Sequence, residues 1–442
     1  LEIQNSINAA EFRQNVTFDG VYDGPINVGV AGVGGNMTFL GVATDPDDAG
    51  AGDRTISSTI TIGTGFGTAA AAPGALGGDL VFGGETDTDA VNFSGTFIAG
   101  STALDSIEIF GDFSGLLSTD FLQAGGGGTT NAFDAGEGAL GSLNVTGDFS
   151  GNVLGILGIG DTTVGGDLTG AGGGAIVFGT ASGAAGDSFL ANMGLLTVEG
   201  DTNITDGGIL INIAVNGNFG DVNLNGGGTA VGTIVTGGIL GGTATGAVNI
   251  TGGAASGVAV HGFDLDSGTL GNFTVTGDGT TGTTFKLDDA ANTGMTSTAG
   301  AFNLSDITVS GFDTITLADA IAPGAASTAG NFSFDANGGA AGTAFNSTGG
   351  ITLLDSSGTF TFTSLANTIA ATGITVTNTS GAVTINGDTA INGDFTSATM
   401  GAFLVDGDAT FANGVGILST GNLASFEVTG DTVFNSTAGS NL

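Results

Sequence analysis

Two clusters of carboxylates in the N-terminal part of the chain could bind calcium. The first cluster lies in a loop rich in Pro and Gly. The second alternates along the chain, so that on a strand its members would share one face. Calcium takes about six to eight oxygen ligands, and carboxylates this close repel one another unless a cation neutralises them. The alternative is a pair of solvated acidic loops with mobile counterions. The clusters are Asp45, Asp47, Asp48 and Asp53, and Glu85, Asp87 and Asp89; smaller acidic pairs are Asp264 with Asp266 and Asp288 with Asp289.

A further group of carboxylates follows glycine at the end of short apolar phrases. In a Gly-Asp pair, Gly can adopt positive φ and the Asp side chain can hydrogen bond its own backbone, which favours a turn. If the phrases stack in register, these carboxylates would form a column of like charges, and bridging calcium ions would relieve the repulsion. The sequence leaves both roles open. The residues are Asp112, Asp148, Asp201, Asp278, Asp408 and Asp431.

The residues that most enzymes use for nucleophilic, acid–base or zinc chemistry are nearly missing. The chain has no Cys and a single His, His261, so neither a common zinc site nor a Ser-His-Asp triad is indicated. Lys286 lies close to Asp288 and Asp289, which favours a local ion pair. Paired carboxylates could cleave a polysaccharide, but Trp is absent and Tyr22 is the one Tyr available as a sugar platform. We expect a protein that is not an enzyme, with a polysaccharide-active β-helix enzyme as an alternative.

The charge balance excludes several partners. The chain has 42 Asp and Glu against three Lys and Arg, which gives a net charge of -39. Phosphate groups and anionic lipid surfaces are bound through Lys and Arg, so nucleic acid is excluded and an anionic membrane surface is disfavoured. No uninterrupted apolar run reaches about 18 residues, so no membrane span is expected. Cations, with calcium first, are the natural ligands.

The composition favours a folded all-β chain. Hydrophobic residues make up 40% of the chain, including 30 Phe, which argues against disorder. Val, Ile, Thr and Phe alternate with small polar residues, as they do in strands. The 88 Gly argue against helix, because each costs about 1 kcal/mol in a helix interior relative to Ala. One short helical turn is expected at the start, where Ser6 could cap a segment that extends to Arg13.

One phrase recurs along the chain and predicts the architecture. It holds Leu, two residues, an apolar residue, any residue, Val or Ile, any residue and Gly-Asp, as at residues 104–112 and 140–148. Many of its Asp or Asn positions follow one another closely, as 148 and 167, 201 and 218, 388 and 408, and 408 and 431 do. The longer steps, from position 112 to 148 and from 167 to 201, are close to two units. Because one unit cannot bury its apolar face alone, the pattern predicts a parallel β-solenoid with coils of roughly 17–23 residues.

Aromatic residues support stacking of these coils. Phe113, Phe149 and Phe395 each follow Gly-Asp, and Phe219 follows Gly-Asn. A similar register in successive coils would stack them as a ladder inside the core. The rival fold is a string of tandem antiparallel β-sandwich domains, which also use short strands and frequent turns.

The first hundred residues differ in composition from the rest. They hold two of the three basic residues, the only Tyr and three of the four Pro. We therefore expect residues 1–100 to be an N-terminal cap or assembly segment and residues 101–442 to be the repetitive β-solenoid. The C-terminus stops just after a repeat strand without an evident cap, which favours end-to-end assembly.

Twelve Asn-x-Ser/Thr sequons occur, a modest excess over the number expected in a chain so rich in Ser and Thr. They would matter if the source glycosylates its surface proteins. The asparagines are Asn15, Asn36, Asn92, Asn144, Asn203, Asn249, Asn272, Asn303, Asn331, Asn346, Asn378 and Asn435.

The repeated Val-x-Gly-Asp phrase in a Cys-free, Lys-poor, Gly- and Thr-rich chain resembles bacterial and archaeal β-strand-repeat surface proteins of the S-layer, adhesin or extracellular-filament type. The resemblance covers about residues 100–442 and implies export, a structural role and often calcium. Tandem Gly-Gly-x-Gly-x-Asp nonapeptides of the calcium-binding kind are echoed at residues 77–79 and 83–89, but no tandem run occurs.

The expected function follows from these points. We expect a secreted, extracellular or cell-surface structural protein that self-assembles into a layer or filament, with calcium neutralising its acidic contacts. Copies of the same chain are the expected partner, and cell-surface glycans are a second class. An adhesin or passenger stalk without self-assembly is the alternative. The start at Leu1, without an export signal, favours a processed mature form.

Overall fold

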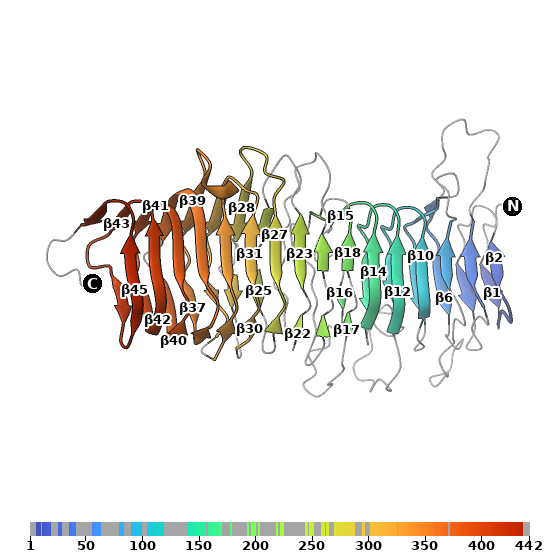
Figure 1. The fold of residues 1–442 in the computed structure, drawn as a ribbon. Helices are drawn as coiled ribbons and strands as arrows, with labels where there is room; N and C mark the ends of the chain where they lie inside the picture. The colour runs from blue at the N-terminus through green and yellow to red at the C-terminus, as the bar shows by residue number, and fades with distance from the viewer. Residues whose placement is uncertain are drawn as a thin grey trace. The chain divides into compact units, whose positions relative to one another are not determined.

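The computed structural model is all-β, and its strands pair in parallel (Figure 1). Within the part of the chain that the structure describes, the pairings that build the strand columns are parallel, and an isolated bridge between Gly83 and Ala90 is antiparallel. This pattern contradicts tandem antiparallel sandwiches there and is compatible with a solenoid. The described residues are 6–9, 11–18, 25–28, 35–40, 55–62, 79–83, 90–99, 104–118, 139–155, 158–169, 177–178, 192–193, 196–199, 202–203, 218–219, 222–224, 244–245, 247–251, 258–260, 262–264, 269–287, 294–296, 301–324, 326–369 and 372–435.

The chain divides into two compact units, Leu1–Gly200 with Ile204–Gly220 and Asp201–Asn203 with Asp221–Leu442. In unit 1, strands that are far apart in sequence pair in succession and form columns. The first column consists of β2 (Val16–Phe18), β4 (Met37–Phe39), β7 (Leu80–Phe82), β10 (Leu104–Ile109), β12 (Ala139–Val145), β14 (Gly158–Val164) and β18 (Leu196–Val198), with β17 (Asn192–Met193) also pairing β14, and β20 (Asn218–Phe219) pairing β17. The second column consists of β1 (Ile7–Ala9), β3 (Ile26–Val28), β6 (Thr59–Ile62), β9 (Thr96–Ala99), β11 (Leu116–Ser118), β13 (Asn152–Gly155) and β16 (Val177–Phe178). Shorter strands are β5 (Thr55–Ile56), β8 (Asn92–Phe93), which pairs β5, and β15 (Leu168–Thr169).

The register of unit 1 confirms the repeat phrase and corrects its length. Leu104 pairs with Leu140 and Ile109 with Val145, so the two copies of the phrase align residue by residue. We call the stretch from one strand to its next partner a repeat. The long step from position 112 to 148 is therefore one repeat and not two units, because the extra length is inserted at residues 119–138, between strands that still pair directly. Thr162 pairs with Leu196 in the same way across the other long step.

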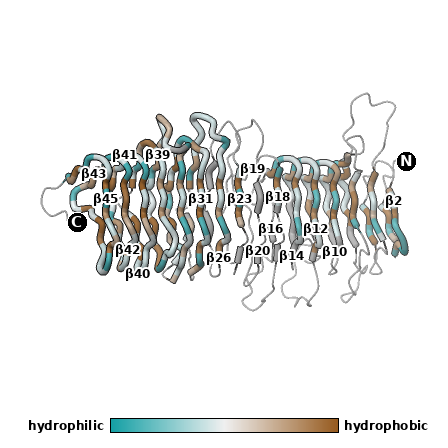
Figure 2. Tube along the Cα trace, viewed as in Figure 1, coloured by the Kyte–Doolittle hydropathy of each residue, from teal (hydrophilic) through white to brown (hydrophobic). Residues whose placement is uncertain are grey.

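The core of unit 1 lies between the columns. Strands present alternate residues inward, and Ile107, Ile109, Leu143 and Val145 are all buried. Full burial of such a side chain stabilises the fold by about 1.5–3 kcal/mol. Both apolar and polar residues occur along the coloured strands of Figure 2. The apolar columns therefore account for the recurrence of the phrase.

The predicted phenylalanine ladder is confirmed in unit 1. Phe113 and Phe149 are fully buried, and their ring centroids lie 4.8 Å apart. Phe93 continues the column at 6.1 Å from Phe113. A second run of rings joins Phe18, Phe39 and Phe82, with centroid distances of 4.8 and 5.0 Å. Phe219 lies in β20, and its side chain is outside the described set.

Unit 2 is built in the same way from four columns. The first consists of β21 (Val222–Leu224), β23 (Val248–Thr251), β27 (Phe273–Thr276), β31 (Ile307–Ser310), β35 (Phe332–Asp335), β39 (Phe360–Ile369), β41 (Val383–Ile391), β42 (Phe395–Asp406) and β45 (Leu423–Val428). The second consists of β24 (Val258–Val260), β28 (Thr284–Leu287), β32 (Thr314–Leu317) and β36 (Ala344–Ser347), followed by parts of β39 and β41 and then β43 (Ala409–Phe411) and β46 (Thr432–Phe434).

The remaining columns of unit 2 use shorter strands. One consists of β25 (Gly262–Asp264), β29 (Gly294–Thr296), β33 (Ile321–Ala322), β37 (Ile351–Leu353) and β40 (Ile374–Ser380), followed by part of β42 and β44 (Ile417–Ser419). The other consists of β22 (Ala244–Thr245), β26 (Thr269–Leu270), β30 (Asn303–Leu304), β34 (Thr328–Ala329) and β38 (Asp355–Ser356). The helical element of the described chain is the 3-10 turn η2 (Asn337–Gly339), and β19 is Thr202–Asn203.

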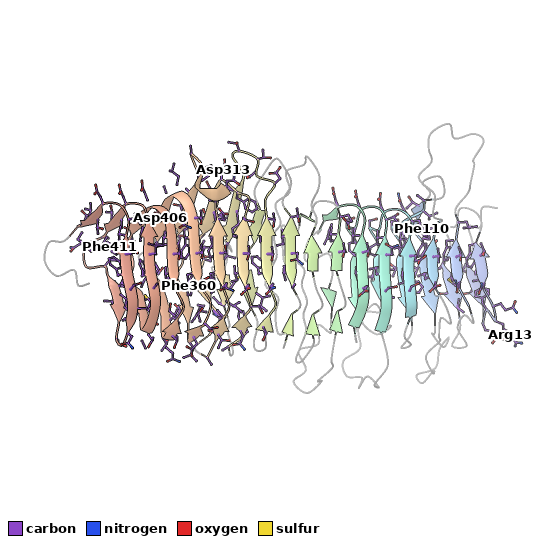
Figure 3. All side chains as sticks on the ribbon, viewed as in Figure 1. Arg13, Phe110, Asp313, Phe360, Asp406 and Phe411 are labelled. Carbon is purple, nitrogen blue, oxygen red and sulfur yellow. The ribbon has the colours of Figure 1, made fainter. Side chains whose placement is uncertain are left out.

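In unit 2, phenylalanine rings stack where the strand register places one phenylalanine next to another, and they do not form one continuous ladder among the described residues. Phe332 and Phe360 are both buried, and their rings stack with centroids 4.9 Å apart. Figure 3 labels Phe360. Phe395 is buried, but its partners in register are Ile374 and Ile417. The prediction that Phe395 joins an in-register phenylalanine ladder is therefore wrong, because its column places isoleucine before and after it. Its ring instead meets Phe403 edge-on, with centroids 4.9 Å apart.

The start of the chain is extended, which contradicts the expected helical turn after Ser6. Residues Ile7–Ala9 form β1 and pair in parallel with β3. Asn27 donates its side-chain amide to Asn8 Oδ1 at 2.9 Å across this pair. Pairing with the next repeat therefore overrides the local helix signal. Strands β1 to β4, β6, β7 and β9 belong to the same two columns as β10 and β11. The role of residues 1–100 as a cap or assembly segment stays a prediction.

Candidate functional site: the cross-repeat Asx ladders

The two acidic clusters predicted to bind calcium lie outside the described residues. This applies to Asp45, Asp47, Asp48 and Asp53, and to Glu85, Asp87 and Asp89. It also applies to His261, Asp266, Asp288 and Asp289. In the portions that the structure describes, no group of three or more His, Cys, Asp or Glu side chains is arranged to hold a metal ion. Calcium at the two clusters stays a prediction.

Four of the six predicted Gly-Asp carboxylates, in contrast, come together as the sequence predicts for stacked repeats, whereas Asp201 lies outside the described residues and Asp278 binds within its own turn. In unit 1, Asp112 Oδ1 accepts the backbone N–H of Asp148 at 2.8 Å, and Asp148 Oδ1 accepts that of Asp167 at 2.9 Å. The column begins at Asn92, whose Oδ1 accepts the N–H of Asp112 at 2.8 Å. Each side chain thus binds the backbone of the next repeat. We call such a column an Asx ladder.

Two more ladders run through unit 2. Asp388 Oδ1 accepts the N–H of Asp408 at 3.0 Å, and Asp408 Oδ1 accepts that of Asp431 at 2.7 Å. The other ladder precedes the strands of the first column and mixes residue types. It runs from Asn272 to Asp306, Asn331 and Thr359 with N–H···Oδ1 distances of 3.3, 2.7 and 2.9 Å.

The glycines before Asp148 and Asp431 make room for the preceding carboxylate of the ladder. A Cβ built on Gly147 would collide with Asp112 Oδ1, and one on Gly430 would collide with Asp408 Oδ1. Gly147 is not among the described glycines with positive φ, whereas Gly387 and Gly407 have φ of 109° and 154°. The expectation that the Gly of the phrase supplies positive φ therefore holds only in part. In unit 1, Gly is required because a backbone N–H must approach a carboxylate closely.

The ladder carboxylates lie at the surface. Asp112, Asp148, Asp388, Asp408 and Asp431 are exposed. A carboxylate has two acceptor oxygens, so the bond at Oδ1 leaves the second oxygen able to accept further donors or a cation. Neighbouring members are one strand spacing apart, about 4.8 Å. The ladders therefore combine structural hydrogen bonds with columns of like charge.

Other acidic side chains of unit 2 also bind backbone and amide donors. Asp355 accepts from the Asn378 amide at 3.1 Å and from the Thr379 backbone N–H at 2.9 Å, and these two bonds lower the pKa of Asp355. The Thr280 hydroxyl and then its N–H lower the pKa of Asp278, which forms a local turn as predicted.

Asp313 joins two loops of unit 2. Gly282 donates its backbone N–H to Asp313 Oδ2, and Asn337 donates its side-chain amide to Asp313 Oδ1, both at 2.5 Å. Asn337 has a φ of 40°, which is rare for a residue other than Gly. Asp313 therefore fixes the loops at this edge of the unit, where Figure 3 labels it.

Lys286 lies in β28, in register with Ala259 and Thr316 of the neighbouring strands. Asp264 ends β25 and is in register with Thr296. As for membrane association, the structure has no helix, among its described residues, with the length and apolarity to span a bilayer.

Sequence reasoning missed the asparagine members of the ladders. The signal was present as a triplet of Asn or Asp, an apolar residue, and Ser or Thr. It occurs at residues 92–94, 112–114, 148–150 and 167–169, which form one column. The search for carboxylates alone left out Asn92.

Comparison with known proteins gives no relative from which a role could be transferred: no family model, no curated protein and no solved structure matches the chain.

Proposed function

We propose that the chain is a parallel β-solenoid that serves as a secreted structural protein and self-assembles into a cell-surface layer or extracellular filament. In this proposal the protein is not an enzyme, and calcium neutralises its acidic contacts. Copies of the same chain are the main partner, and cell-surface glycans are a second partner class.

The observation that carries the proposal is the residue-by-residue match of successive repeats. The apolar positions of one phrase pair with the same positions of the next, as Ile107 does with Leu143 and Ile109 with Val145. The Gly-Asp pairs that end the phrases also bind one another. Each repeat is thus covered by another repeat of similar shape, which is how solenoids build extended, stiff surfaces. Such a surface suits a scaffold.

The exposed acid columns support the calcium part of the proposal. Asp112 and Asp148 are exposed one strand spacing apart, in a chain with a net charge of -39. Surface charges of one sign oppose close approach of two copies, and the repulsion falls when a divalent cation binds both. Assembly is therefore expected to require calcium or high ionic strength.

The test is negative-stain electron microscopy of the purified chain with millimolar calcium and again after chelation. Filaments or sheets that dissolve on chelation support the proposal. Assemblies that persist after chelation would still support a structural role. The contacts between copies would then be backbone pairing and apolar packing rather than calcium bridges. Strictly single particles at high concentration with calcium contradict self-assembly and favour an adhesin or passenger stalk.

Two variant sets locate the calcium. In the first, Asp45, Asp47, Asp48 and Asp53 are replaced by Asn; in the second, Asp112, Asp148 and Asp167 are replaced by Asn, which keeps an Oδ1 acceptor at each ladder position. If assembly no longer depends on calcium in only one of the two sets, the calcium is assigned to the residues replaced in that set. Turnover of acidic or neutral glycans in a parallel screen would contradict the non-enzymatic role.

A further inference from the structure

Six described asparagines use their side chains to bind the next repeat, and each of the six begins an Asn-x-Ser/Thr sequon. In every case Oδ1 accepts a backbone N–H from a residue 20 to 43 positions further along the chain. The asparagines are Asn15, Asn36, Asn92, Asn272, Asn303 and Asn331.

Strand geometry explains why these positions read as sequons. An Asn at the ladder position is followed by a residue that points into the core, as Phe93 and Phe332 do. The residue after that points outward, where Thr and Ser are favoured in strands. Asn, an apolar residue and then Thr or Ser is therefore the triplet that a ladder position produces without any selection for glycans.

Asp occupies equivalent places in the same columns. Asn92-Phe-Ser is followed in its column by Asp112-Phe-Ser, Asp148-Phe-Ser and Asp167-Leu-Thr. Asp offers the same Oδ1 acceptor but no amide nitrogen for a glycan. These positions therefore share the Oδ1 atom that accepts a hydrogen bond. They do not share the amide nitrogen to which a glycan would be attached.

The amide nitrogen is also engaged at two of the six positions. Asn36 donates Nδ2 to Asp79 Oδ2 at 3.3 Å, and Asn331 donates Nδ2 to Asp306 Oδ1 at 3.1 Å. A glycan would replace one of the two hydrogens on an Nδ2 that already donates to a carboxylate of a neighbouring repeat. Modification there competes with the contact between repeats.

We infer that these six asparagines clamp one repeat to the next and are not glycan acceptors in the folded protein. The inference concerns modification and goes beyond the proposed structural role. It makes the sequon excess a consequence of the fold.

Three variants at one site separate the two roles. Asn92→Ala removes both the clamp and the sequon. Asn92→Asp removes the sequon but supplies the acceptor found at Asp112. Ser94→Ala removes the sequon alone, because the Ser94 backbone N–H, which binds Ile56 O, is unchanged. With protein from a host that does not glycosylate, measured at about 1 M salt so that repulsion between the new carboxylate and Asp112 is screened, we expect Asn92→Ala to lower Tm by about 2–4 °C and the other two variants to stay within about 1 °C. An unchanged Tm for Asn92→Ala would overturn the clamp role.

The glycan part is tested on protein secreted from a host that N-glycosylates. Peptide mass mapping is expected to find the six clamp asparagines unmodified in the folded fraction. Asn435, whose side chain is exposed, serves as the internal acceptor control. Sugar on Asn92 or Asn331 in folded protein would overturn the inference.

Discussion

The carboxylate of Asp112 accepts the backbone N–H of Asp148 at 2.8 Å, although 36 residues separate the two. The bond exists because Gly147, which precedes Asp148, has no side chain in the space that Asp112 Oδ1 occupies. One glycine and two aspartates therefore fix the register between two repeats whose connecting segment is long.

Replacement of Gly147 by Ala is the direct test of this relationship. The new Cβ would collide with Asp112 Oδ1 and with the backbone of Gly111, and overpacking of this kind costs about 1–3 kcal/mol. We expect a lower urea midpoint at an unchanged m-value. Thr146→Ala, at the exposed neighbouring position, is the control and is expected to change stability by less than about 0.5 kcal/mol. Equal stability of the two variants would remove the steric explanation for the Gly-Asp pair.

The charge column predicts a salt-dependent effect at Asp148. Asp148→Asn keeps an Oδ1 acceptor for Asp167 while removing repulsion from Asp112 and Asp167. We expect this variant to be more stable than the parent at about 10 mM salt and close to it at about 1 M, where the Debye length falls to about 3 Å. Asp148→Ala loses the hydrogen bond as well as the charge, so it is expected to be about 1 kcal/mol less stable than Asp148→Asn at either salt concentration. A gain for Asn that does not respond to salt would contradict repulsion as its cause.

The repeat phrase allows the register of unit 1 to be predicted, because its apolar positions must all face the same core. Leu104 pairs with Leu140 as the alignment of the two phrases requires. Repeat length is less predictable, since an insertion between two strands does not disturb their pairing. The long steps, from position 112 to 148 and from 167 to 201, therefore resemble two units each in the sequence, although the paired strands make each of them one repeat.

The sequence predicts the aspartate members of the ladders but not the asparagine members, although both accept the same hydrogen bond. A column of Gly-Asp carboxylates follows from stacking, and it is present. The asparagine members escaped, because Asn and Asp serve the same purpose at Oδ1 but differ in charge. The predicted helical turn after Ser6 is wrong because it rests on a local capping signal. Such a signal carries no information on the distant strand with which a segment pairs, and Ile7 pairs with Ile26.

A buried hydroxyl in unit 1 predicts a stabilising substitution. Thr162 Oγ1 is buried without a hydrogen-bond partner, in a column between Leu143 and Leu196. An unsatisfied buried hydroxyl costs about 1–3 kcal/mol, so Thr162→Val, which has nearly the same shape, is expected to raise stability by about 1 kcal/mol. Thr163→Val, on the exposed face of the same strand, controls for the higher strand propensity of Val. An equal gain in both variants would attribute the effect to propensity.

The lowered pKa of Asp355 predicts how acid weakens unit 2. The Asn378 amide and the Thr379 N–H favour the charged carboxylate, so the folded-state pKa lies below the unfolded value of about 3.9. The stabilisation is therefore fully present above about pH 4 and is lost as pH falls toward the folded-state pKa. Asp355→Asn cannot titrate and is expected to be less stable than the parent at pH 6, with the difference shrinking below about pH 4. Urea midpoints from pH 2 to 6 measure this, and a difference constant with pH would contradict it.

Limited proteolysis tests whether the second column of unit 2 is continuous at β28. Lys286 lies mid-strand, with Ala259 in register on one side and Thr316 on the other, so trypsin reaches the following bond only after both pairings open. We expect cleavage there to be at least about 100-fold slower than in the urea-unfolded chain. Thr281→Lys places a new site in the exposed turn just before the strand and is expected to be cut rapidly in the folded protein. Because both bonds lie in one short segment, the ratio of the two rates measures the opening of the strand itself. Equal rates would mean that β28 is not held by its neighbours, and stacking of the repeats would then fail as an account of this column.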